Sequence, residues 1–98
     1  MTSTSAFISE LTDAADRVEM LTKHQRAALL ELAAVSIEHL RSRAGYGAAL
    51  NDAGDMVLEL RGMAQLIVLF SAAEVATIML SAASVIQVAQ SVAEQKAH

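Results

Sequence analysis

The chain has 98 residues, a formal net charge of −4 and a composition that is 54% apolar, with neither cysteine nor proline. This length predicts one domain, and the lack of cysteine excludes disulfides, thiolate nucleophiles and thiolate metal sites. The acidic balance disfavours nucleic acid, because phosphates repel a negative surface. So large an apolar fraction in so short a chain points to oligomerisation or to a membrane.

The first predicted helix covers residues 5–21. Its apolar residues recur at alternating intervals of four and three, and they are Phe7, Leu11, Ala14, Val18 and Leu21. This interval is typical of a helix that packs along one face. Because acidic residues occupy the other faces, we expect an amphipathic helix with one solvated side.

A second helix is predicted over residues 23–44. Thr22 and Gln25 fit the capping box, in which each side chain accepts a hydrogen bond from the other residue's backbone N–H. Leucine, isoleucine and alanine follow at helical intervals. Gly45 suits the left-handed position after a helix, and the glycine-rich residues 45–55 are the expected connection to the next element.

From residue 55 to residue 95 the pattern is helical throughout. An unbroken helix of this length would measure about 60 Å at ~1.5 Å per residue, which is too long for a compact body of this size. We therefore expect a break, either at Gly62 or within residues 81–84, where Ser84 and Gln87 fit a second capping box.

The long segment carries only a narrow polar stripe. Between Gly62 and Ala93, Glu74 is the only formal charge. The polar residues follow one another at steps of three or four, at Ser71, Glu74, Thr77, Ser81, Ser84, Gln87, Ser91 and Glu94. A helix that meets water along one ribbon lies in the centre of a bundle or in an interface.

Two amphipathic helices cover only part of such a segment, so a second copy is expected to cover the rest in a homodimer. The residues predicted for the dimer or partner interface are Leu66, Ile67, Phe70, Glu74, Ile78, Val85 and Ile86. Glu74 would either accept a basic side chain across this interface, for example Arg61 of a second copy, or reach solvent along the stripe.

The titratable residues of the second helix do not form a catalytic or metal site. His24, Glu31 and Glu38 are seven residues apart, which is about 10 Å of helical rise and too far for two ligands of one ion. They are interpreted as a solvated face, with His39 beside them. We therefore predict no catalytic residue, no metal and no cofactor.

Two further groups of residues allow more than one interpretation. Four methionines suit either an adaptable binding groove or core filling, and core filling is favoured: Met20, Met56, Met63 and Met79. The basic residues of the second helix lie at its two ends rather than in one stripe, which argues against a DNA-binding surface: Lys23, His24, Arg26, Arg41 and Arg43.

The sequence thus predicts an all-α protein of three to four helices. The expected architecture is an antiparallel bundle with a long apolar C-terminal helix, completed by dimerisation. The expected function is a non-enzymatic protein–protein interaction module, a small regulatory protein of a bacterial cytoplasm that binds a partner through a helical face.

Two alternatives remain open at this point. The first is a small membrane-associated helical protein, because residues 66–84 hold one charge in nineteen positions and are long enough to span hydrocarbon. Glu74 in its centre and the continuous polar stripe argue against a span. The second alternative is a helical DNA-binding protein, which the acidic net charge disfavours.

Overall fold

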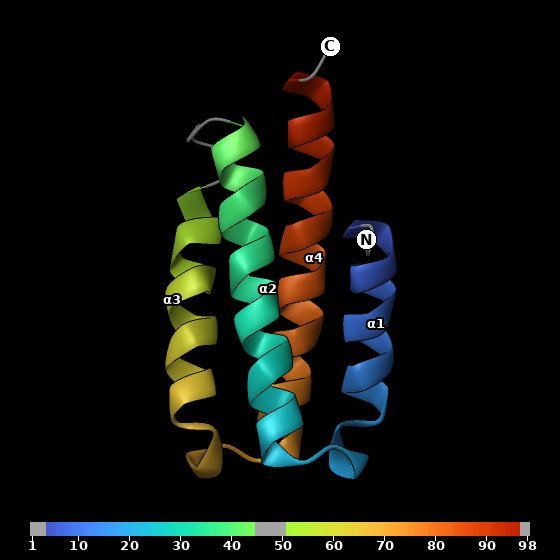
Figure 1. The fold of residues 1–98 in the computed structure, drawn as a ribbon, viewed down its shortest axis with the longest axis vertical. Coiled ribbons are helices and arrows are strands. Elements are labelled where there is room, and N and C mark those ends of the chain that lie inside the picture. The colour runs from blue at the N-terminus through green and yellow to red at the C-terminus, as the bar shows by residue number, and fades with distance from the viewer. Residues whose placement is uncertain (1–3, 45–50, 97–98) are drawn as a thin grey trace.

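The computed structural model describes residues 4–44 and 51–96, and all regular elements within them are helices (Figure 1). The α-helices are α1 (Thr4–Asp16), α2 (Lys23–Ala44), α3 (Asn51–Gln65) and α4 (Ala72–Lys96), and single 3₁₀ turns η1 (Val18–Met20) and η3 (Ile67–Leu69) precede α2 and α4. The predicted all-α class is confirmed. The prediction for Gly45 and for residues 45–50 of the connection lies outside the described residues. Residues 51–55, predicted to belong to this connection, instead form the first turn of α3.

The four helices form two hairpins that interlock. The first hairpin is α1–η1–α2 and the second is α3–η3–α4. Figure 1 shows α2 and α4 side by side in the centre, running in the same direction, with α3 and α1 on opposite flanks and both 3₁₀ turns at one end. The main contacts of α1 are with α4, and those of α3 are with α2. Each short helix therefore packs on the long helix of the other hairpin.

The two hairpins are an internal repeat with an interval of 49 residues, half the chain. The residue directly after the short helix has nearly the same backbone in both: Arg17 has φ −113° and ψ 21°, and Leu66 has φ −111° and ψ 30°. Buried residues also correspond across the interval, in the pairs Leu11 and Leu60, Ala15 and Ala64, Ala33 and Ala82, Ala34 and Ala83, and Ile37 and Ile86. The fold thus has an approximate twofold relation between its halves.

A capping box starts the long helix of each hairpin. The backbone N–H of Gln25 donates to Thr22 Oγ1 at 3.0 Å, and that of Thr22 donates to Gln25 Oε1 at 2.9 Å. In the second hairpin Glu74 N–H donates to Ser71 Oγ at 3.2 Å, and Ser71 N–H donates to Glu74 Oε1 at 3.0 Å. These reciprocal bonds satisfy donors that helix geometry leaves free.

The break in the C-terminal segment lies at residues 66–71, so the two predicted positions are wrong. Gly62 lies within α3, and residues 81–84 lie within α4. The chain breaks where Phe70 is extended, with φ −111° and ψ 140°, immediately before the capping box of Ser71. Likewise the first helix ends at Asp16 rather than at residue 21, because Arg17 leaves α-helical geometry (φ −113°, ψ 21°) and the 3₁₀ turn η1 follows.

One chain buries much of α4 by itself. Val75, Met79 and Ile86 of α4 are fully buried, together with Leu30 and Ile37 of α2. The polar stripe faces solvent as expected, but the exposed face is wider than the stripe, since two large apolar residues of α4, Leu80 and Val88, are also about half exposed.

An ion pair fixes α3 on α2. Arg61 donates from Nη1 to Glu38 Oε1 at 2.6 Å and from Nη2 to Glu38 Oε2 at 3.0 Å. Both side chains are partly exposed, so the pair contributes modestly to stability and mainly fixes the position of α3. The hydrogen bonds to Glu38, opposed by desolvation, raise the pKa of Arg61 above its ordinary value. Glu38 is thereby paired across helices, and His24, Glu31 and His39 are exposed.

Candidate protein-interaction site

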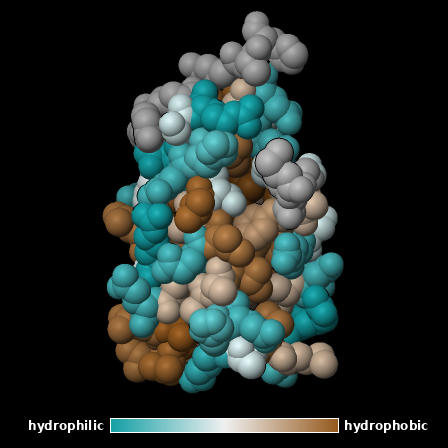
Figure 2. Space-filling view, viewed as in Figure 1, coloured by the Kyte–Doolittle hydropathy of each residue, from teal (hydrophilic) through white to brown (hydrophobic). Residues whose placement is uncertain are grey.

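The second hairpin carries an exposed cluster of aliphatic side chains at its turn. We call this cluster the apolar tip, and it consists of Leu66, Val68 and Leu69, with exposed fractions of 53%, 67% and 70%. In Figure 2 a hydrophobic patch is visible at the lower left, the position that η3 occupies in Figure 1. Because contiguous exposed apolar patches are typical of surfaces that contact proteins or membranes, the apolar tip is a candidate interaction site.

The first hairpin provides an internal control for the apolar tip. Arg17 and Glu19 occupy the positions that correspond to Leu66 and Val68, and both are exposed. Since the same turn forms with charged residues at these two positions, folding does not require leucine and valine there. The third residue of the apolar tip, Leu69, corresponds to Met20, which is also apolar and is 84% exposed. The contrast between the two turns is therefore confined to Leu66 and Val68.

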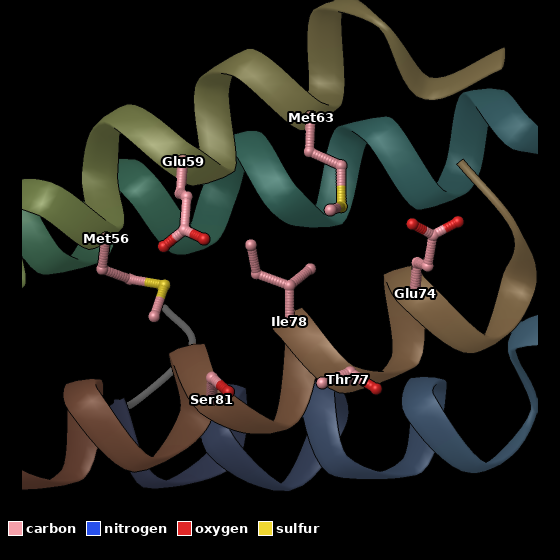
Figure 3. Close-up of a pocket in the computed structure, with 7 residues that line it drawn as sticks. All are labelled: Met56, Glu59, Met63, Glu74, Thr77, Ile78 and Ser81. Atoms are coloured by element: carbon pink, nitrogen blue, oxygen red, sulfur yellow. The ribbon is translucent and has the colours of Figure 1, made fainter. Parts of the chain in front are cut away.

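A groove between α3 and α4 opens on the same hairpin (Figure 3). We call it the α3–α4 groove. Its volume is about 300 Å³, and its lining residues are Met56, Glu59, Met63, Glu74, Thr77, Ile78 and Ser81. Figure 3 shows Met56, Glu59 and Met63 directed from α3 toward α4, with Glu59 between the two methionines, and Ile78 and Glu74 directed from α4 toward α3.

Helical spacing places these side chains together. Met56, Glu59 and Met63 lie on α3 at steps of three and four, and so share one face. The four residues from α4 also repeat at helical intervals, starting from the capping residue Glu74. Because α3 makes its main contacts with α2, its contacts with α4 are few, and the seam between α3 and α4 stays open.

The corresponding seam of the first hairpin has different side chains. Phe7 stands where the second hairpin has Met56, and Leu32 stands where it has Ser81. Phe7 is buried, whereas Met56 is only partly buried. Glu10 corresponds to Glu59 and is likewise exposed. The two seams thus share a carboxylate but differ in the residues that line them.

Glu74 is held by its own capping box rather than by a basic partner. Its pKa is lowered, first by the backbone N–H of Ser71, which donates to the carboxylate, and then by the Ser71 side chain. The suggested pairing of Glu74 with Arg61 of a second copy is disfavoured, because the Arg61 guanidinium already donates to Glu38 of the same chain.

We expect Glu74 to make the stability of the protein depend on pH in the acid range. A carboxyl group whose pKa is lower in the folded state stabilises the fold above its unfolded pKa of about 4.3, and this contribution disappears as the pH falls through the folded pKa. Glu74→Gln should remove this dependence while keeping the cap, because Gln25 makes the same pair of bonds in the first hairpin. Urea unfolding at pH 7 and pH 3 measures the difference.

The converse variant is the control. Gln25→Glu places a carboxylate in the first capping box and should add acid sensitivity of the same sign. If Glu74→Gln and the wild-type protein lose stability equally between pH 7 and pH 3, the interaction of the ionised Glu74 with the Ser71 N–H does not contribute to folding.

The seven residues predicted for the interface lie in different environments. Leu66 belongs to the apolar tip, Glu74 is exposed, and Ile67, Phe70 and Val85 are partly buried. Two others are in the core of the single chain, since the exposed fractions of Ile78 and Ile86 are 7% and 0%. The seven residues therefore do not form one outer surface, although Ile78 also lines the α3–α4 groove.

The four methionines were interpreted from the sequence as either core filling or an adaptable binding groove, and the structure contains examples of both. Met79 is fully buried, Met56 and Met63 line the α3–α4 groove, and Met20 is exposed in η1. Sequence patterns alone did not lead us to predict three features: the repeat, the Ser71 capping box and the apolar tip. The signal for the cap was present in Ser-Ala-Ala-Glu at residues 71–74.

Length and composition would allow one described helix to cross a membrane. In Ala72–Glu94 the mean hydropathy reaches 1.6, and 39% of the residues in the window are buried inside the fold. A core helix of a soluble protein meets the same condition, and α4 packs against both α1 and α2. This feature is therefore weak support for a membrane span.

Within residues 4–44 and 51–96, no group of three or more histidine, aspartate or glutamate side chains is placed to hold a metal ion. Comparison of the chain with protein-family models, with curated proteins and with solved structures finds no match. The site is therefore interpreted from its own geometry.

Proposed function

We propose that this chain is a non-enzymatic protein–protein interaction module, a small regulatory protein that binds a partner protein through its second hairpin. The observation that carries the proposal is the exposure of Leu66 and Val68 of the apolar tip at positions where the first hairpin has Arg17 and Glu19. Burying a large aliphatic side chain contributes about 1.5–3 kcal/mol, so covering the apolar tip supplies a few kcal/mol of binding free energy.

The apolar tip is too small to be the whole interface. A stable protein interface takes roughly 20–30 residues from each partner, and the apolar tip has three. The α3–α4 groove begins beside it, since Met63 precedes Leu66 by one turn and Glu74 lies in the first turn of α4, the helix that follows η3. We infer that a partner covers the apolar tip together with the adjoining groove.

We also propose a homodimer, but the surface that supports it is not the one predicted from the sequence. One chain already buries Val75, Met79 and Ile86, so a second copy is not needed to cover the centre of α4. The large apolar side chains left exposed for self-association are those of the apolar tip and, elsewhere among the described residues, Met20, Leu32, Val35, Leu58, Leu80 and Val88. In this proposal the chain binds its partner, another protein or a second copy of itself, in the cytoplasm.

Exchanging the apolar tip for the charged residues of the first turn tests the proposed function. In Leu66→Arg with Val68→Glu, the fold should persist, because the first hairpin forms the same turn with these residues. Loss of two aliphatic contacts should weaken partner binding about 100-fold, at 1.4 kcal/mol per factor of ten. Native mass spectrometry after purification at native expression measures both the partner and the number of copies of the chain.

The matched control reverses the charges of the first turn, in Arg17→Glu with Glu19→Arg, and should bind as the wild-type protein does. A complex that is lost only with the altered apolar tip supports the proposal. A complex that survives this change, or a wild-type chain that purifies as a solitary monomer, contradicts it. Recovery only in a detergent-extracted fraction would favour the membrane alternative.

A further inference from the structure

We propose that the α3–α4 groove binds an amphipathic helix that carries lysine or arginine beside its apolar face. This inference rests on the proposed function and adds the chemistry of the partner. Its starting point is the combination in one groove of apolar side chains, Met56, Met63 and Ile78, which we call the floor, with two exposed carboxylates, Glu59 and Glu74, which we call the rim (Figure 3).

The floor of the groove fits the apolar face of a helix. Met56 and Met63 are seven residues apart on α3, so the floor extends over about 10 Å, or two helical turns. Helices dock in such grooves through apolar anchors at i, i+3, i+4 and i+7. Methionine side chains are flexible and adapt to the shape of the anchor. The groove therefore accepts a short apolar stripe without demanding one particular sequence.

The charge of the rim selects among amphipathic helices. Glu59 and Glu74 are both exposed, and the seven lining residues include no lysine, arginine or histidine. Asp55, one turn before Glu59 on α3, is exposed and adds a third negative charge near the groove. The cation closest in sequence, Arg61, is bound to Glu38. A helix with acidic flanks would meet like charges, whereas basic flanks are complementary.

The capping box leaves part of Glu74 available for a partner. Its Oε1 accepts the Ser71 N–H at 3.0 Å, and no hydrogen bond to Oε2 is found among the described residues. Its lowered pKa keeps the carboxylate ionised at neutral pH. Among the described residues no salt bridge or hydrogen bond involves the Glu59 side chain. Both carboxylates can thus accept charge-assisted hydrogen bonds from a basic side chain.

Methionine methyl NMR on the full chain tests the proposal directly. The probes are two synthetic helical peptides of 18 residues with leucine at i, i+3, i+4 and i+7, one filled with lysine and the other with glutamate. The ¹³C-methyl signals of Met56 and Met63 report on the groove, that of Met20 reports on the first turn, and that of Met79 reports on the core. We expect saturable shifts of Met56 and Met63 with the lysine peptide only.

Charge variants complete the design. Glu59→Lys should weaken binding of the lysine peptide at least tenfold, and raising the salt concentration should weaken it as well. Glu10→Lys changes the corresponding exposed carboxylate of the first hairpin and should leave the affinity within twofold. Helix content by circular dichroism shows that both variants are folded.

Several results would overturn the proposal. They are equal binding of the two peptides, shifts of Met20 in place of Met56 and Met63, and an unchanged affinity in Glu59→Lys. Shifts of Met56 and Met63 that arise on concentrating the protein alone would assign the groove to a second copy instead. A failed peptide titration combined with a partner complex that depends on Leu66 and Val68 would refute the groove assignment and leave the proposed function standing.

Discussion

Replacing Ile86 by alanine is expected to destabilise the protein by about 2–5 kcal/mol, the range found when a large aliphatic side chain is removed from a core. Ile86 has an exposed fraction of 0% and lies on α4, which packs against both α1 and α2. Since small domains have total stabilities of about 5–15 kcal/mol, this is a large share. Urea unfolding followed by circular dichroism measures the loss.

The repeat supplies a second variant with the same expectation. Ile37 occupies the corresponding position on α2 and is also fully buried. Ile37→Ala should therefore cost a similar amount. Val88→Ala, at a half-exposed position of α4, is the surface control and should cost little, since exposed substitutions usually stay within about 0.5 kcal/mol.

The same experiment distinguishes a core role of Ile86 from the interface role predicted from the sequence. Stability that depends on association changes with protein concentration by mass action. If Ile86 packs only within one chain, the stability difference between wild type and Ile86→Ala should be the same at 1 and 100 µM protein. A difference that grows with protein concentration, or a loss below about 1 kcal/mol, would contradict the core assignment.

The sequence predicts much of the local structure because local rules decide it. Hydrophobic periodicity identified the helices, and the Thr22 capping box located the start of α2 at Lys23. The polar stripe of α4 was also recognised, and Ser84, Gln87 and Ser91 face solvent. Each of these features depends on residues a few positions apart in one helix.

The break before α4 was misplaced because an apolar run continues through it. Ile67, Val68 and Leu69 have the composition of a helix interior, yet they form a 3₁₀ turn, because the Ser71–Glu74 cap requires Phe70 to be extended. Comparing the chain with itself at an interval of 49 residues aligns this cap with that of Thr22. The repeat therefore contained the information that periodicity alone lacked.

The candidate site depends on how helices are placed, which periodicity does not determine. Met56 and Ser81 share the α3–α4 groove only because α3 packs on α2 and leaves its seam with α4 open. The sequence shows apolar residues at both Ile86 and Leu69, but the fold buries the first and exposes the second. Only the tertiary arrangement separates core residues from surface residues in so apolar a segment.

Enlarging a buried alanine should destabilise the protein by about 1–3 kcal/mol, the usual cost of overpacking a core. Ala33 and Ala82 correspond in the repeat, and both have exposed fractions of 0%. Small side chains let helices approach closely, and the closely packed interior has no room for three additional carbon atoms. Ala82→Leu and Ala33→Leu should each lower the urea midpoint of unfolding.

Ala28→Leu is the matched control for this overpacking, because Ala28 lies on the exposed face of α2 and leucine is a good helix former. It should leave stability nearly unchanged. If Ala82→Leu were as stable as Ala28→Leu, α4 would have to shift relative to its neighbours without cost, and the packing of α4 against α1 and α2 would not be specific. If only Ala82→Leu and Ala33→Leu lose stability, and by similar amounts, the interlocking of the two hairpins is held by the same small-residue packing in both halves.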